Sequence, residues 1–125
     1  MKENKHFEFT FKNRARFGKG IFNTLPSILK ELRYDKIGFV IDSAIYKNKP
    51  FIADIVELCK ADFSRVITHI YKQSFEPTYD YLDIVKWEFK EESESLVDVL
   101  VAIGGGSTID TAKGISTIIT NHDPA

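Results

Sequence analysis

The sequence predicts an α/β fold with a mostly parallel sheet and an extended segment or hairpin at the N-terminus. Apolar segments with the pattern of strands alternate along the chain with segments of helical spacing, and glycine or proline stands at several of the breaks. Strands that alternate with helices favour parallel pairing with right-handed crossovers. The 125 residues are 43% hydrophobic and 28% charged, so we assign residues 1–125 to a single domain.

The N-terminal part is expected to begin with extended chain. Three phenylalanines alternate with polar residues over 7–11, which predicts a strand of period two. Residues 14–17 are expected to continue as a second extended piece. Apolar side chains then recur at helical spacing over 21–33, and Pro26 lies near the start of this helix, where its missing N–H costs little.

The middle of the chain predicts a strand, a helix and a strand. Residues 36–41 form a short apolar run that ends at Asp42, which is typical of a buried strand. Residues 49–60 follow with an apolar helical stripe, and Cys59 on this stripe is expected to be a core residue. Residues 65–71 are rich in β-branched side chains and predict a further buried strand.

The last part of the chain contains one more pair of helices around a strand. Pro77 interrupts the pattern, and Thr78 is the predicted N-cap of a helix that extends to about Ser93. Residues 97–103 form a nearly continuous apolar strand, which glycines end abruptly. Helical spacing resumes over 107–120.

Composition argues against several classes of protein. The 17 Lys and Arg side chains are balanced by 18 Asp and Glu, so we expect no nucleic-acid partner. A single cysteine excludes an intrachain disulfide. No apolar run approaches the length of a membrane span, and the N-terminus lacks the apolar core of a signal peptide. We therefore expect a cytoplasmic protein with no membrane partner.

A glycine loop, Gly104-Gly105-Gly106-Ser107, joins the last predicted strand to the last helix. Glycines allow close approach of a ligand to the backbone, and a helix N-terminus favours phosphate. Ser107 is the expected N-cap, with Asp110 completing a capping-box-like arrangement. The loop lacks the Gly-Lys-Ser/Thr ending of a nucleoside triphosphate site. A tight turn without a ligand is the alternative, but three glycines are costly for that purpose alone, so we predict phosphate binding.

Asp42 is the second candidate. An acid at the end of a buried strand can accept hydrogen bonds from a ribose 2′-OH and repel a 2′-phosphate. It can equally serve as a turn or N-cap residue, and the sequence leaves both interpretations open.

Residues 103–113 resemble the G-G-G-S-x-x-D-x-A-K signature of the iron-containing (group III) alcohol dehydrogenases, with related sequences in glycerol dehydrogenases and dehydroquinate synthases. Weaker similarities occur in the same order along the chain. Residues 17–20 resemble the family's F-G-x-G, residues 39–42 its apolar strand ending in Asp, and residues 76–78 its Pro-Thr step. Asp98 resembles the acid that precedes the glycine strand.

The resemblance implies a Rossmann-like three-layer domain that binds NAD, with NADP less favoured because of Asp42. The backbone N–H groups of the glycine loop would hold the pyrophosphate, and Asp110 and Lys113 would point toward the nicotinamide. For these two, a helix-start acid and an exposed lysine are equal alternatives. The implied cofactor-binding residues are Asp42, Pro77, Thr78, Gly104, Gly105, Gly106, Ser107, Asp110 and Lys113.

The family's iron or zinc is held by an Asp and three His in a helical C-terminal domain. This chain has only His6, His69 and His122, so we expect no catalytic and no metal-binding residues in it. It resembles the cofactor half of an alcohol dehydrogenase and is predicted to be inactive alone. The alternative is a stand-alone nucleotide-binding or interaction module that self-associates to cover apolar surface. A dehydroquinate synthase-like or glycerol-phosphate dehydrogenase-like relative is a third interpretation.

Overall fold

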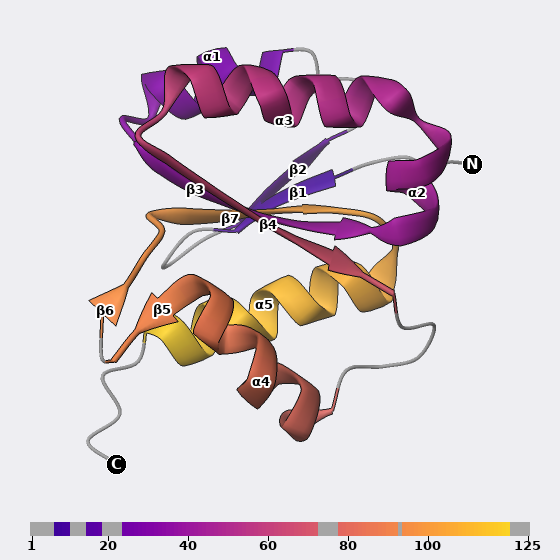
Figure 1. Ribbon diagram of the computed structural model, residues 1–125, viewed down its shortest axis with the longest axis vertical. Helices are drawn as coiled ribbons and strands as arrows, with labels where there is room; N and C mark the ends of the chain where they lie inside the picture. Colours follow the sequence, from indigo (N-terminus) through magenta and orange to yellow (C-terminus); the bar gives the residue numbers. More distant parts are fainter. Residues whose placement is uncertain (1–6, 11–14, 19–23, 73–77, 93, 121–125) are drawn as a thin grey trace.

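A five-stranded sheet lies between two layers of helices (Figure 1). The computed structural model describes residues 7–10, 15–18, 24–72, 78–92 and 94–120. One face of the sheet is covered by α1 and α3, and the other face by α4 and α5. The three-layer α/β arrangement predicted from the sequence is confirmed.

The sheet combines a parallel core with an antiparallel hairpin. Its order is β2-β1-β7-β3-β4, in which β7, β3 and β4 are parallel and β1 is antiparallel to both β2 and β7. The strands are β1 (Phe7–Thr10), β2 (Ala15–Gly18), β3 (Lys36–Asp42), β4 (Arg65–Tyr71) and β7 (Val99–Ile103). The expected N-terminal hairpin is therefore present, and it extends the sheet beside β7.

Five helices and a short second hairpin complete the described part. The helices are α1 (Leu25–Glu31), α2 (Ser43–Asn48), α3 (Pro50–Asp62), α4 (Tyr79–Phe89) and α5 (Gly106–Thr120), and the hairpin joins β5 (Lys90–Glu91) to β6 (Glu94–Ser95). Two features differ from the sequence prediction. Helix α2 was not expected, and it forms because the Asp42 carboxylate caps its start. Helix α4 ends at Phe89, before the predicted limit of about Ser93, since Lys90 adopts extended backbone (φ −147°, ψ 154°) and begins β5.

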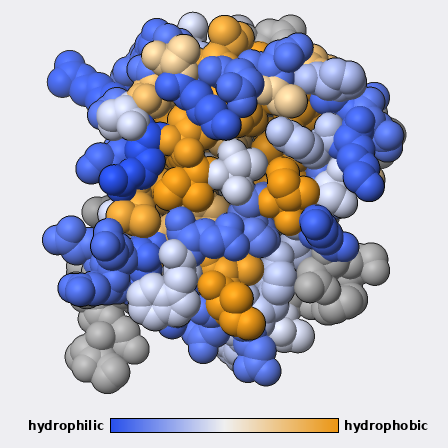
Figure 2. All heavy atoms as spheres, viewed as in Figure 1, coloured by the Kyte–Doolittle hydropathy of each residue, from blue (hydrophilic) through white to orange (hydrophobic). Residues whose placement is uncertain are grey.

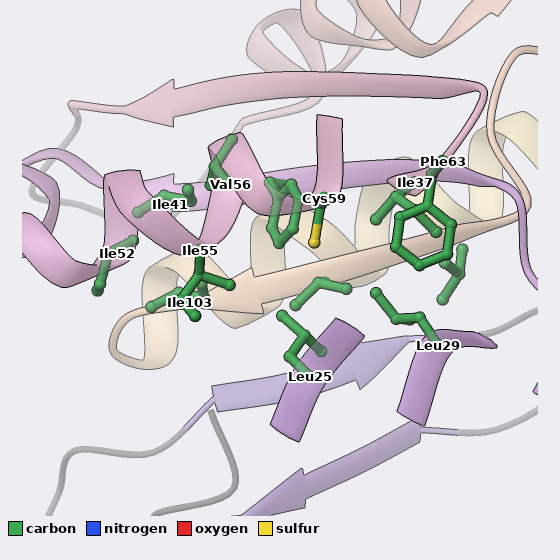
Figure 3. Close-up of a cluster of buried hydrophobic side chains, with 13 residues drawn as sticks. Leu25, Leu29, Ile37, Ile41, Ile52, Ile55, Val56, Cys59, Phe63 and Ile103 are labelled. Carbon is green, nitrogen blue, oxygen red and sulfur yellow. The ribbon is translucent and has the colours of Figure 1, made fainter. Parts of the chain in front are cut away.

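Alternation along β3 and β7 divides the core into two clusters. Ile41 pairs with Ile103 and both contribute to the cluster beneath α1 and α3, whereas Val40 and Ala102 contribute to the cluster beneath α4 and α5. Figure 3 shows the first cluster, in which side chains from α1 and α3 meet those of the two strands. Cys59 is fully buried there, as predicted, and burial raises the pKa of its thiol to about 11.

Strand β4 lies at the edge of the described sheet, where it pairs with β3. The side chains of Val66 to Ile70 are half-buried, and Figure 2 shows hydrophobic residues gathered between the two helical layers where this strand lies. The sequence predicted a fully buried strand here. The difference arises because β4 has a neighbouring strand on one side only within the described residues.

Two aspartates connect the amino ends of the parallel strands through hydrogen bonds. Asp98 Oδ2 accepts hydrogen bonds from the backbone N–H groups of Asp35 and Lys36, each at 3.0 Å. Asp35 Oδ1 in turn accepts from the N–H of Ser64 at 3.1 Å. Hydrogen bonds from the side chain and backbone of Ser64 hold the pKa of Asp35 below its usual value. The acid that precedes the glycine strand therefore connects the starts of β7 and β3.

Candidate functional site

The loops that carry the candidate residues leave the sheet where its parallel strands end, which is the carboxyl edge of the sheet. Ile41 is in register with Ile103 on one side and with Ile70 on the other, so Asp42, which ends β3, lies beside Gly104, which follows β7. The chain passes from β3 to β4 on one side of β3, whereas β7 lies on the other side. The strand order therefore reverses between β3 and β7, which is where open α/β sheets bind ligands.

The N-terminal hairpin brings a second glycine segment to this edge. Phe7 pairs with Ile103 in one direction and with Gly18 in the other. Gly18 therefore ends β2 in the same row of the sheet in which Ile103 ends β7. Gly20, from the same F-G-x-G segment, is outside the described residues. The structure thus places the end of β2 at the edge that carries the glycine loop.

Gly104 packs directly against Asp42. A Cβ atom on Gly104 would lie 2.9 Å from the Asp42 Cβ and 2.6 Å from Thr108 Oγ1, and the φ of Gly104 is 156°. Packing and backbone conformation both require glycine at this position. Thr108, which is 1% exposed, was not singled out from the sequence. Its place one helical turn before the buried Ala112 is the pattern that signals a core-facing residue.

Gly105 and Gly106 differ from Gly104 in this respect. Both are exposed, and a Cβ atom on either residue would meet nothing within 4 Å among the residues that the structure describes. Among the described glycines, Gly104 is the one with positive φ, so backbone conformation does not require glycine at 105 or 106 either. The fold therefore leaves open space over the backbone of these two residues.

The start of α5 corrects one prediction. The helix begins at Gly106, and its first hydrogen bond runs from the Ile109 N–H to the Gly105 carbonyl at 3.0 Å. Gly105 is therefore the N-cap, and Ser107 lies within the first turn. The predicted capping role of Ser107 is wrong, because the carbonyl that accepts the first helical hydrogen bond belongs to Gly105, two residues earlier. The capping-box-like arrangement with Asp110 is also wrong, since it required Ser107 as the cap.

The first turn of α5 leaves backbone donors free of helical partners. The N–H groups of Gly106, Ser107 and Thr108 precede the first i to i−4 hydrogen bond of the helix. The partial positive charge of the helix N-terminus adds to these donors. An anion at the open space beside Gly105 and Gly106 would meet both.

Asp42 is the N-cap of α2. Its Oδ2 accepts from the N–H groups of Ala44 at 3.1 Å and Ile45 at 3.2 Å. The capping interpretation is confirmed, and the ribose interpretation stays a prediction. Both of these bonds are made by Oδ2, so the capping of α2 uses one of the two carboxylate oxygens.

Thr78 follows β4 in the chain and caps α4. Its Oγ1 accepts from the N–H of Tyr81 at 3.1 Å, which confirms the predicted N-cap. Pro77 lies outside the described residues.

Asp110 and Lys113 lie on the exposed side of α5, opposite the buried Ala112 and Ile115. At about 1.5 Å per residue, Lys113 is about 10 Å along the helix from Gly106. The structure therefore places these two side chains one and two turns beyond the glycine loop, and their contact with nicotinamide stays a prediction.

Comparison with models of known protein families identifies the family of the chain. The profile described as iron-containing alcohol dehydrogenase matches residues 12–125, which include the glycine loop, Asp42 and Thr78. The chain belongs to the iron-containing alcohol dehydrogenase family. This is an oxidoreductase family, and the resemblance seen in the sequence is confirmed. No solved structure matches the chain.

The described residues of this alcohol dehydrogenase-family chain do not fit an iron site. Among them, no three His, Cys, Asp or Glu side chains lie close enough together to hold a metal ion. His69 is hydrogen-bonded to Glu88 and Tyr81, and His6 and His122 lie outside the described part. Within the described part of the chain, no helix combines the length and apolar character of a membrane span.

Proposed function

We propose that this chain binds NAD⁺ at the carboxyl edge of its sheet, as the cofactor-binding part of an alcohol dehydrogenase-type oxidoreductase. The observation that carries the proposal is the open space over Gly105 and Gly106. Neither packing nor φ requires glycine at these two positions, whereas both require it at Gly104. A ligand that must approach the backbone closely accounts for the two additional glycines.

The pyrophosphate is the part of the cofactor that suits this space. In the proposed complex, the backbone N–H groups of Gly105, Gly106 and Ser107 donate to its oxygens. The N-terminus of α5 supplies a favourable electrostatic field, because its first N–H groups have no helical acceptor. This is a backbone site, so it does not require a basic side chain.

Asp42 is proposed to bind the adenosine ribose. Its Oδ2 is fixed by the start of α2, which leaves Oδ1 to accept a ribose hydroxyl. A 2′-phosphate in the same place would be repelled by the carboxylate, which favours NAD⁺ over NADP⁺. Thr78 would face the adenine, while Asp110 and Lys113 would lie toward the nicotinamide.

Bound NAD⁺ supplies the hydride acceptor of an alcohol oxidation. The role proposed for this chain is to bind and orient the cofactor. The described residues form no iron site, so we propose no turnover by them alone. The metal that the family's name implies would require ligands from outside the described part.

Calorimetric titration with NAD⁺ and, separately, NADP⁺ tests the proposal. We expect NAD⁺ to bind and NADP⁺ to bind more weakly. Asp42→Asn keeps a good N-cap and removes the charge, so it should raise the affinity for NADP⁺ relative to NAD⁺. Asp54→Asn, at an exposed position on α3, is the matched control and should leave the ratio unchanged. Failure of the wild-type chain to bind NAD⁺ would contradict the proposal.

A further inference from the structure

Three side chains form a hydrogen-bonded chain between β4 and α4. Glu88 Oε1 and Oε2 lie 3.0 and 3.2 Å from His69 Nδ1, and His69 Nε2 lies 2.6 Å from the Tyr81 hydroxyl oxygen. His69 comes from β4, and its side chain is 13% exposed. Tyr81 and Glu88 come from α4 and are seven residues apart. The hydrogen bonds therefore connect two turns of the helix to the strand.

The chemistry of the three groups fixes the direction of the hydrogen bonds. An ionised Glu88 can only accept, so the N–H at His69 Nδ1 donates a hydrogen bond to the carboxylate. In a neutral imidazole, Nε2 is then an acceptor, so the Tyr81 hydroxyl donates to it. The order carboxylate, imidazole, hydroxyl is that of a nucleophilic triad.

The environment of Tyr81 argues against a nucleophile. Burial, with smaller contributions from Tyr71 and Glu88, raises the pKa of Tyr81 to about 12. An activated nucleophile needs a lowered pKa or a base that readily takes its proton. The phenol therefore stays protonated and acts as a fixed hydrogen-bond donor, which suits a group that holds two elements together.

Tyr81 also connects this hydrogen-bonded chain to the carboxyl edge of the sheet. Its backbone N–H donates to Thr78 Oγ1, and its ring packs edge-on against Tyr71 with 5.8 Å between the ring centroids. Tyr71 is the last residue of β4, and Thr78 is the N-cap of α4. One residue thus bridges the end of β4 and the start of α4.

The strand order indicates which part of the cofactor meets the start of α4. In the order β7-β3-β4, the pyrophosphate would lie beyond β7 and the ribose beside Asp42 after β3. A cofactor in this orientation directs its adenine past the end of β4, toward the start of α4. Thr78 is the N-cap of that helix.

We propose that Glu88, His69 and Tyr81 are positioning residues that fix the start of α4 for the adenosine half of the cofactor. This inference rests on the proposed NAD⁺ site. None of the three touches the reacting atoms, and they act through Thr78 and the first turn of α4.

Tyr81→Phe removes the phenolic hydrogen bond and keeps the ring against Tyr71. Tyr34→Phe is the matched control, because Tyr34 packs against the cluster beneath α1 and α3, on the other face of the sheet. The wild-type chain and both variants are titrated with NAD⁺, AMP and nicotinamide mononucleotide. We expect Tyr81→Phe to weaken NAD⁺ and AMP by about three- to tenfold and to leave nicotinamide mononucleotide unchanged. Glu88→Gln should weaken the binding of the same two ligands by a smaller factor, and Tyr34→Phe should change the affinity for none of the three.

The three ligands separate positioning from general loosening of the fold. Equal weakening of AMP and nicotinamide mononucleotide by Tyr81→Phe would show a structural role and overturn the inference. Wild-type affinity of Tyr81→Phe for AMP and NAD⁺ would also overturn it, while leaving the NAD⁺ site intact. If the wild-type chain does not bind NAD⁺, the proposed function fails first, and this inference fails with it.

Discussion

Aspartates have different roles at the amino edge of the sheet, where the parallel strands begin, and at the carboxyl edge, where they end. At the amino edge, Asp98 accepts from the backbone of Asp35 and Lys36, and Asp35 accepts from Ser64. These acids are used to hold the fold together. At the carboxyl edge, the capping bonds of Asp42 involve one carboxylate oxygen, and two exposed glycines border open space. The comparison indicates that polar groups which the fold does not use mark the edge at which a ligand is expected to bind.

The glycine loop shows the same contrast within three residues. Gly104 is needed by the fold, because a Cβ atom there would lie 2.6 Å from Thr108 Oγ1 and its φ is 156°. Gly105 and Gly106 are not needed by the fold in either respect. A substitution can therefore separate stability from binding within one loop.

The largest expected effect is that of Gly104→Ala. Overpacking against Thr108 and Asp42, added to the unfavourable φ, should lower the free energy of unfolding by about 3 kcal/mol. Urea denaturation of the wild-type and variant chains measures this change. A variant as stable as the wild type would break the comparison, because Gly104 would then be no more structural than its neighbours.

A smaller loss is expected at the amino edge. Asp98→Ala removes the acceptor for two backbone N–H groups at an exposed position and should lower the free energy of unfolding by about 1 kcal/mol. Affinity for NAD⁺ should not change, because this edge is opposite the proposed site. Asp54→Ala serves as the control for loss of an exposed carboxylate. A weaker NAD⁺ affinity in Asp98→Ala with unchanged stability would reverse the roles assigned to the two edges.

The smallest expected effect depends on pH. The pKa of Asp35 is lowered in the folded chain from 3.8, so its contribution to stability is present above that value and is lost as pH falls through the folded pKa. The difference in melting temperature between wild type and Asp35→Asn should therefore narrow as pH is lowered from about 6 to about 3. A constant difference across this range would show that ionisation of Asp35 does not support the amino edge.

Much of the architecture could be predicted from local pattern. Apolar runs in β3 and β7, helical spacing in α3 and the cap at Thr78 each depend on residues close together in sequence. Helix α2 was missed because its start depends on one carboxylate rather than on an apolar stripe. The half-burial of β4 could not be predicted either, since it depends on which strand lies at the edge of the sheet.

The residues of the glycine loop could be predicted from the sequence, but the different roles of the individual residues could not. The three consecutive glycines pointed to the loop, but the sequence treated them as equivalent. Only the packing of Thr108 and Asp42 around Gly104 separates it from the other two. The resemblance included Asp98 without a role, and only the structure shows that it accepts from the backbone of Asp35 and Lys36. The hydrogen-bonded chain of Glu88, His69 and Tyr81 was missed because His69 is remote in sequence from the other two residues. The packing of α4 on β4 brings the three together.

The most direct test of the central claim pairs two measurements on Gly106→Val. The claim is that Gly106 is glycine for a ligand and not for the fold. The melting temperature should be unchanged or slightly raised, because valine is a better helix former than glycine and its Cβ meets nothing within 4 Å. Calorimetric affinity for NAD⁺ should fall by about tenfold or more. A variant that binds NAD⁺ as the wild type does, or one that loses binding only because it unfolds, would contradict the claim.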